Sequence, residues 1–135
     1  MEDRRMVSLN PQDELFLKSL GQRWEVIRDG SIWVLVHDYA LPEGYVQKTV
    51  ILAVRIEAGY PAAPLDMMYV YPAVSRLDGK AIRQTEVLQP IDQKQFQRWS
   101  RHRTPDNPWL SNQDSLETHM YFIEEAFRAE FTKQP

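Results

Sequence analysis

The residue best placed to do chemistry in this sequence is His102, which lies in a long segment of weak periodicity at 73–108. Its neighbours include Trp99, Arg101 and Arg103. An imidazole changes charge near neutral pH, so a histidine in such a segment can act as a general acid or base. The alternative is an exposed histidine in a basic loop. If any residue of this chain is catalytic, we expect it to be His102.

The other two histidines, His37 and His119, are predicted to lie in a strand and on the last helix, where packing or a hydrogen bond is the more ordinary role. The three histidines lack the close spacing of a metal-binding helix motif, and the sequence identifies no carboxylate that would complete a site with them. We therefore predict no metal. The sequence also contains no glycine-rich phosphate loop, and we predict no cofactor.

The sequence contains no cysteine, which excludes disulfides, zinc–thiolate sites and thiol nucleophiles. The hydroxyls of Ser75, Thr85 and Ser100 could in principle form an ester, but a hydroxyl needs a base to activate it. No nucleophile elbow and no adjacent base pattern is visible in the sequence. We therefore assign no catalytic role to these hydroxyls.

A basic cluster of Arg98, Arg101 and Arg103 lies close to Trp99 and Trp109. Arginine offers a planar fork of donors that suits an acidic protein surface or a C-terminal carboxylate. Interleaved basic and aromatic residues also suit single-stranded nucleic acid, and a third interpretation is aromatic packing with solvated arginines. Because the chain carries a formal net charge of −3, we expect a protein partner and no nucleic acid.

The length and composition of the chain indicate the size of its core and the number of its domains. With 135 residues and 43% hydrophobic content, the chain can bury one sizeable core, so we expect a single domain at 1–135. The N-terminal residues lack the apolar segment of a signal peptide, and no stretch approaches the ~18 apolar residues of a membrane span. We expect a soluble cytoplasmic protein that does not bind a membrane.

These candidate residues must be positioned by a sheet organised around residues 49–72. The first half of this stretch alternates apolar residues with polar ones such as Arg55 and Glu57, which predicts a strand with one core face. Pro61 and Pro64 then end the strand, because proline donates no backbone N–H. The apolar run at 67–71 predicts an antiparallel partner strand.

The preceding residues predict a helix and a hairpin. Asn10 before Pro11 suits a helix N-terminus, and Gly21 suits its end. Strands at 24–28 and 32–38 flank Asp29-Gly30, a dipeptide typical of a type I′ turn. We therefore expect a helix followed by a four-stranded antiparallel meander.

The second half of the chain is predicted to be a long irregular connection at 73–108 and a final helix. Short helical turns are plausible at 93–99. Ser111 with Asp114 resembles a capping box at the start of the helix. The apolar residues that follow recur at helical spacing and form the predicted core face of this helix. They are Leu116, Met120, Ile123, Phe127 and Phe131.

The order of these elements, with the sequence YPAAP at 60–64, resembles the ubiquitin-conjugating enzyme superfamily. In that family a strand leads into a Tyr-Pro-x-x-Pro-Pro corner, and here Leu65 replaces the last proline. The sequences LPEGY at 41–45 and WSRH at 99–102 make the chain most similar to the bacterial branch called prokaryotic family E. The resemblance covers roughly Leu9 to Phe131. It implies an α+β, UBC-like fold.

The family forms a thioester on a cysteine that follows a His-Pro-Asn triplet and a short glycine turn. The triplet remains here only as Tyr71-Pro72-Ala73, and Asp78-Gly79 is similar to the glycine turn. Counting forward as the family does places Ile82 about where the cysteine would stand. Since thioester transfer requires a thiolate and this chain has no cysteine, it cannot use the family's ordinary mechanism.

The resemblance also implies which proteins are the partners of this chain. Members of the branch tend to be encoded beside ubiquitin-like proteins, an activating enzyme and a deconjugating metallopeptidase, in gene sets associated with defence against phage. We therefore expect a cysteine-less adaptor or binding protein for a ubiquitin-like protein and its activating enzyme. The alternative is a stand-alone, RWD-like binding module unrelated to conjugation.

Two surfaces are candidates for partner binding. The family resemblance implies an edge where Asp13 and Lys18 of the first helix lie beside the proline corner. The competing surface is the basic segment near the former active centre. The predicted partner-binding residues are Tyr60, Pro61, Pro64, Trp99, Arg101, His102 and Arg103.

Overall fold

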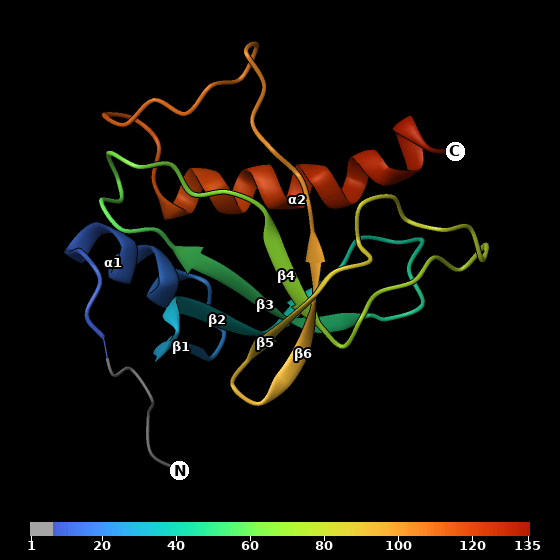
Figure 1. The fold of residues 1–135 in the computed structure, drawn as a ribbon, viewed down its shortest axis with the longest axis horizontal. Helices are drawn as coiled ribbons and strands as arrows, with labels where there is room; N and C mark the ends of the chain where they lie inside the picture. The colour runs from blue at the N-terminus through green and yellow to red at the C-terminus, as the bar shows by residue number, and fades with distance from the viewer. Residues whose placement is uncertain (1–6) are drawn as a thin grey trace.

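The computed structural model describes residues 7–135, which form two helices and one six-stranded antiparallel sheet (Figure 1). The strand order is β1-β2-β3-β4-β6-β5. The predicted α+β class is therefore confirmed, with a helix at each end of the chain. The elements are α1 (Pro11–Ser19), β1 (Trp24–Asp29), β2 (Ser31–Ala40), β3 (Thr49–Ile56), β4 (Met68–Tyr71), β5 (Leu88–Ile91), β6 (Lys94–Trp99) and α2 (Leu116–Lys133).

The first half of the chain follows the sequence closely. Asn10 caps α1, because its Oδ1 accepts a hydrogen bond from the backbone N–H of Asp13 at 2.8 Å. Gly21 follows the helix with a φ of 72°, a conformation that glycine adopts without strain. The hairpin is also present, but the predicted type I′ turn is wrong. Asp29 pairs with Ser31 within the ladder, so Gly30 alone lies at the tip.

The predicted helical turns at 93–99 are wrong, because β5 and β6 form a second hairpin there and β6 pairs with β4. The two turn residues, Asp92 and Gln93, have φ angles of 53° and 65°, the left-handed pair that a type I′ turn requires. Neither residue is the glycine that usually marks such a turn, and Pro90 lies within β5. The sheet therefore has two strands more than the predicted four, and the irregular segment is correspondingly shorter.

The start of the last helix also differs from the prediction. The N-cap is Ser115, four residues after the predicted Ser111, and its backbone N–H donates to Thr118 Oγ1 at 2.9 Å. Asp114 has another role, because its carboxylate accepts a hydrogen bond from the backbone N–H of Leu110 at 2.7 Å. It stabilises the turn that precedes the helix.

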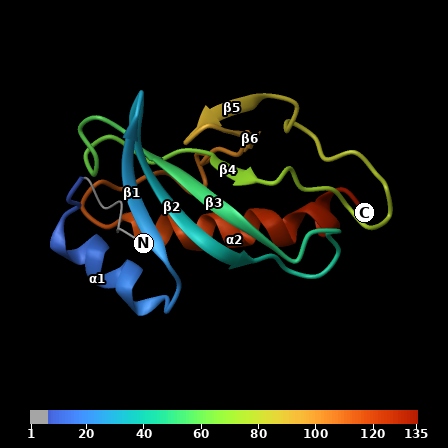
Figure 2. The same ribbon diagram turned by 90° about the horizontal axis from the view of Figure 1, so that it is seen from below.

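The main core lies where α2 packs across one face of the sheet (Figure 2). Four of the five apolar residues predicted to face the core of α2 are buried, and the fifth, Phe131, is partly buried. The ring of Phe127 lies 4.8 Å from that of Trp99 and 6.1 Å from that of Tyr45, measured between centroids. The Tyr45 hydroxyl also donates to the Phe127 backbone oxygen at 2.6 Å. Phe127 thus packs at the centre of the helix–sheet interface.

The opposite face of the sheet is not purely polar, so the prediction of a single core face for β3 is wrong. Alternate residues of the strands form a second, smaller buried cluster that includes Trp33, Ala53 and Tyr69. Arg55, predicted to be on the outer side, does lie there, but its guanidinium packs over the rings of Trp33 and Tyr69 at 4.8 and 5.7 Å. The central strands are therefore covered on both faces.

Replacing Phe127 with alanine should lower the free energy of unfolding by about 3–5 kcal/mol, because a fully buried aromatic ring is lost and leaves a cavity. Chemical denaturation measures the difference. Tyr121→Ala on the exposed side of the same helix is the control and should change stability by about half a kcal/mol or less. A loss below one kcal/mol for Phe127→Ala would contradict this packing.

The prediction that His119 packs within the fold is confirmed, since its side chain is fully buried and stacks on Phe122. Its Nε2 donates to the Met67 backbone oxygen at 2.9 Å, while Nδ1 has no hydrogen-bond partner among residues 7–135. Burial disfavours the charged imidazolium and lowers the pKa of His119 to about 4.

Acidification should therefore destabilise the protein between about pH 6.5 and pH 4, where the unfolded chain binds a proton at His119 that the folded chain excludes. The loss reaches about 3 kcal/mol at the lower limit. Denaturation measured across this pH range tests the expectation. His119→Gln, which keeps a donor for Met67, should flatten the profile, and an unchanged slope would show that His119 does not cause it.

Candidate functional site

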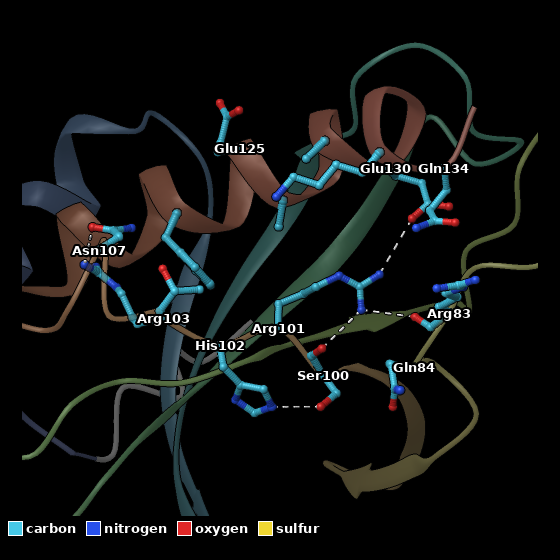
Figure 3. Close-up of a pocket in the computed structure, with 15 residues that line it drawn as sticks. Arg83, Gln84, Ser100, Arg101, His102, Arg103, Asn107, Glu125, Glu130 and Gln134 are labelled. Atoms are coloured by element: carbon cyan, nitrogen blue, oxygen red, sulfur yellow. Dashed lines mark hydrogen bonds and ion pairs between the residues drawn. The ribbon is translucent and has the colours of Figure 1, made fainter.

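A cavity lies between the exposed flank of α2 and two segments, 83–84 and 100–107 (Figure 3). Its volume is about 500 Å³, which is large enough to hold several residues of an extended peptide. We call it the α2 pocket. It is lined by Arg83, Gln84, residues 100–104, Asn107, Phe122, Glu125, Ala126, Ala129, Glu130, Lys133 and Gln134.

His102, the residue predicted to be catalytic if any is, lies in this pocket and contacts two polar side chains. Its Nε2 lies 2.9 Å from Ser100 Oγ, a contact visible in Figure 3. Its Nδ1 lies 2.9 and 3.0 Å from the two carboxylate oxygens of Asp66. A hydroxyl, an imidazole and a carboxylate in this order form the arrangement in which a base activates a nucleophile and a third group orients the base.

The sequence reasoning missed this arrangement, although it had named Ser100 and His102 separately. The missed signal was their spacing, because residues i and i+2 at the end of a strand point to the same side. Asp66 could not be found in this way, since it lies in a different segment. The backbone N–H of Met67 donates to the Arg101 oxygen at 3.2 Å and brings Asp66 beside His102.

Arg101 forms a wall of the pocket and is not a solvated surface arginine. Its Nη1 donates to the backbone oxygens of Arg83 and Ser100 at 3.1 and 3.2 Å, and its Nη2 lies 3.7 Å from Glu130 Oε1. The guanidinium packs 4.8 Å from the Trp99 ring centroid, and the side chain is 22% exposed. Figure 3 shows it extending across the pocket toward α2.

Arg103 is also held by packing. Its side chain is 12% exposed and lies between the rings of Trp109 and Phe122, at 5.3 and 5.4 Å from their centroids. The Nη2 atom lies 3.5 Å from Asp114 Oδ1. Arg101 and Arg103, both predicted to bind a partner, are thus held largely by contacts within the protein.

Trp99 cannot contact a partner directly, because it is fully buried against Phe127. Its Nε1 donates to Gln97 Oε1 at 2.9 Å, so its polar atom is also satisfied inside the protein. The interleaving of tryptophan and arginine that suggested a binding surface is, at this position, part of the core.

The position implied for the family's cysteine lies next to the pocket. Ile82 is itself buried in the main core, while the following residues Arg83 and Gln84 are exposed and line the cavity. The Thr85 hydroxyl donates to the Ile82 backbone oxygen at 2.8 Å. Of the three hydroxyls considered from the sequence, only Ser100 has a histidine within hydrogen-bond distance among the described residues.

The proline corner forms a second candidate surface, and Tyr60 fixes it to both helices. The Tyr60 hydroxyl donates to Asp13 Oδ2 and accepts from the backbone N–H of Leu116, both at 2.7 Å. Asp13 is 1% exposed, so the prediction that it faces a partner is wrong. Lys18 and both corner prolines are exposed, and Pro61 accepts a hydrogen bond through its backbone oxygen from Trp109 Nε1.

No group of three or more histidine, aspartate or glutamate side chains that could hold a metal ion occurs within residues 7–135. The same part of the chain contains no helix that is long and apolar enough to cross a membrane.

The fold is that of an α+β protein of the UBC-like class. It has an N-terminal helix, an antiparallel meander with a Tyr-Pro-x-x-Pro corner, and a last helix across the sheet. The sequence model of prokaryotic E2 family E matches residues 9–130, and the chain belongs to that family. No match is found among curated proteins or solved structures. Membership makes the protein an E2-like component of a prokaryotic ubiquitin-like pathway, and implies in general that it interacts with a ubiquitin-like protein and an activating enzyme.

Replacing Tyr60 with phenylalanine should lower the free energy of unfolding by about 1–3 kcal/mol. The change removes one hydroxyl but leaves the buried Asp13 carboxylate and the Leu116 N–H without this partner. Tyr121→Phe is the matched control, because that hydroxyl is exposed and bonds only to Glu117 in the described structure. Equal stability of the two variants in urea denaturation would show that Tyr60 does not join the helices.

Proposed function

We propose that this protein is a cysteine-less E2-like adaptor that binds the C-terminal tail of a ubiquitin-like protein in the α2 pocket. The observation that carries the proposal is the position of the pocket beside Ile82, where the family resemblance places the centre that receives this tail. The absence of any thiol means that binding here does not lead to a thioester.

The charge of the pocket supports a partner with an acidic surface or a terminal carboxylate. Four cationic side chains line it against two carboxylates, so its wall is positive although the whole chain carries a net charge of −3. Arg101 and Glu130 already interact, which leaves the exposed Arg83 and Lys133 as the cations best able to contact a ligand. A guanidinium binds a carboxylate through two parallel hydrogen bonds.

The proline corner is the proposed docking surface for the activating enzyme. Pro61 and Pro64 are exposed and held in place by the Tyr60 and Trp109 hydrogen bonds, so the corner loses little conformational entropy on binding. Lys18 adds a positive charge on the neighbouring helix. A cytoplasmic location and a role in defence against phage belong to the same proposal, and they are supported by the family resemblance.

Charge reversal tests the pocket. The double variant Arg83→Glu, Lys133→Glu should weaken binding of the ubiquitin-like protein encoded beside the gene in its native host by about tenfold or more, because two attractive contacts become repulsive. Isothermal titration measures the affinity. The control, Arg28→Glu with Lys48→Glu, makes the same change of net charge at exposed residues outside the pocket and should bind as the unaltered protein does.

The outcomes separate the alternatives. Equal affinity of both double variants would show that the pocket is not the binding site. If the unaltered protein itself does not bind, the adaptor proposal is wrong and a stand-alone, RWD-like binding role is favoured.

A further inference from the structure

The contact between Ser100 and His102 has no evident structural purpose. Both side chains lie at the surface of the pocket, and the His102 and Asp66 side chains are 56% and 40% exposed. An exposed polar side chain can satisfy its hydrogen bonds with water, so stability does not require this arrangement. The three groups nevertheless lie at 2.9 Å in the order that nucleophilic catalysis needs.

We propose that Ser100 is an acyl acceptor, activated by His102 and oriented through Asp66, and that it carries the ubiquitin-like protein as an oxyester. This inference rests on the proposed function, because it assumes that the tail bound in the α2 pocket is that of a ubiquitin-like protein. It extends that function from binding to group transfer, with a hydroxyl in place of the thiol that the chain lacks.

The position of Ser100 suits this role. It directly follows β6, and its backbone N–H donates to the Gln84 oxygen at 3.0 Å. Ser100 is thereby fixed against the segment that begins at Ile82, the position implied for the cysteine. Its side chain is partly exposed and faces the cavity, so an acyl chain lying in the pocket can reach it.

The transfer step is a simple acyl exchange between a thioester and a hydroxyl. Ser100 Oγ attacks the carbonyl carbon of the thioester that joins the C-terminus of the ubiquitin-like protein to a cysteine of the activating enzyme, while the Oγ proton passes to His102 Nε2. The tetrahedral intermediate then expels the thiolate by breaking the C–S bond, and the thiolate takes the proton from Nε2. The products are an oxyester on Ser100 and a free thiol, without oxidation or reduction.

Asp66 acts through His102 and is a positioning residue. Its carboxylate lies within 3.0 Å of Nδ1, which holds the proton on that nitrogen and leaves Nε2 free to accept one from Ser100. It also stabilises the imidazolium formed during the step. Docking of the tail removes water from these exposed groups, which strengthens the attraction between the carboxylate and the imidazolium.

The first experiment tests the hydroxyl without any partner protein. Incubation with p-nitrophenyl acetate should acetylate Ser100, as located by peptide mass spectrometry. Ser100→Ala should abolish this acetylation, and His102→Gln should slow it about 100-fold. Ser75→Ala, at an exposed serine outside the pocket, is the control and should leave the rate unchanged. Acetylation that is equally fast without His102 would overturn the assignment.

The positioning role of Asp66 has its own test. Asp66→Asn should slow acetylation of Ser100, and Asp66→Glu should recover part of the rate because a carboxylate is restored near Nδ1. If neither change affects the rate while circular dichroism shows an intact fold, Asp66 does not position His102.

The second experiment uses the full reaction, with the activating enzyme, ATP and the ubiquitin-like protein from the same host. The expected adduct resists thiol reagents, is cleaved by hydroxylamine and disappears in Ser100→Ala. Ser100→Cys should give an adduct that thiol reagents cleave instead, because the same position then forms a thioester.

The two proposals fail in different ways. If titration shows binding of the ubiquitin-like protein but neither experiment modifies Ser100, the acyl-acceptor inference is wrong and the adaptor function stands. If the acetyl probe labels Ser100 through His102 but the ubiquitin-like protein does not bind, the nucleophile stands and its assigned acyl donor is wrong.

Discussion

The contact between Trp99 and Phe127 is the interaction on which the site depends. It joins the end of β6 to the middle of α2, with the two ring centroids 4.8 Å apart in a fully buried position. Ser100 and Arg101 follow Trp99 directly, so this packing fixes where the pocket-lining segment leaves the sheet. A buried Gln97 amide adds to the constraint by bonding both the N–H and the oxygen of Val74. The candidate site is therefore built on the core and not on a free loop.

A buried charge network connects the same pocket to the end of α2. Arg76 is almost completely buried and donates to Glu130 Oε2 at 3.0 Å, and it also pairs with Asp78 at 2.6 Å. Arg76 holds the pKa of the Asp78 carboxyl below its usual range. The other oxygen of Glu130 faces Arg101 at 3.7 Å. Because a buried charge without partners is costly, removal of Glu130 would disturb both arginines at once, and the position of Arg101 in the pocket is tied to a structural network.

The parts of the fold that could be predicted are those with local signals. The strand around Val54, the cap at Asn10 and the helix around Phe127 each depend on signals from neighbouring residues, and each of these elements appears in the structure. The hairpin of β5 and β6 was missed because its turn lacks glycine. There a contact with a distant residue contributes, since Asp29 Oδ2 accepts from the Asp92 N–H at 2.8 Å. Such a contact is not visible in a local sequence pattern.

The candidate site also combines features that have a local sequence signal with features that depend on distant contacts. Ser100 and His102 could be named from residue type, but the orientation of His102 depends on Asp66. Asp66 comes near only because the backbone N–H of Met67 bonds to the Arg101 oxygen. Arg103 was misjudged for a related reason. An arginine beside aromatic residues has the same local sequence whether the rings face a partner or the interior, and burial alone decides between them.

The isoleucine at the implied cysteine position has a consequence for Ser100. A reactive thiol must be accessible, whereas an apolar side chain is stabilised by burial, and Ile82 lies in the core. With Ile82 buried, the carbonyl oxygens of Arg83 and Gln84 accept hydrogen bonds from Arg101 Nη1 and the Ser100 N–H. In a thioester-forming relative, this segment would hold the nucleophile. In this chain, its backbone instead orients Arg101 and Ser100. If the chain does carry an acyl group, that backbone is what fixes the serine toward the pocket.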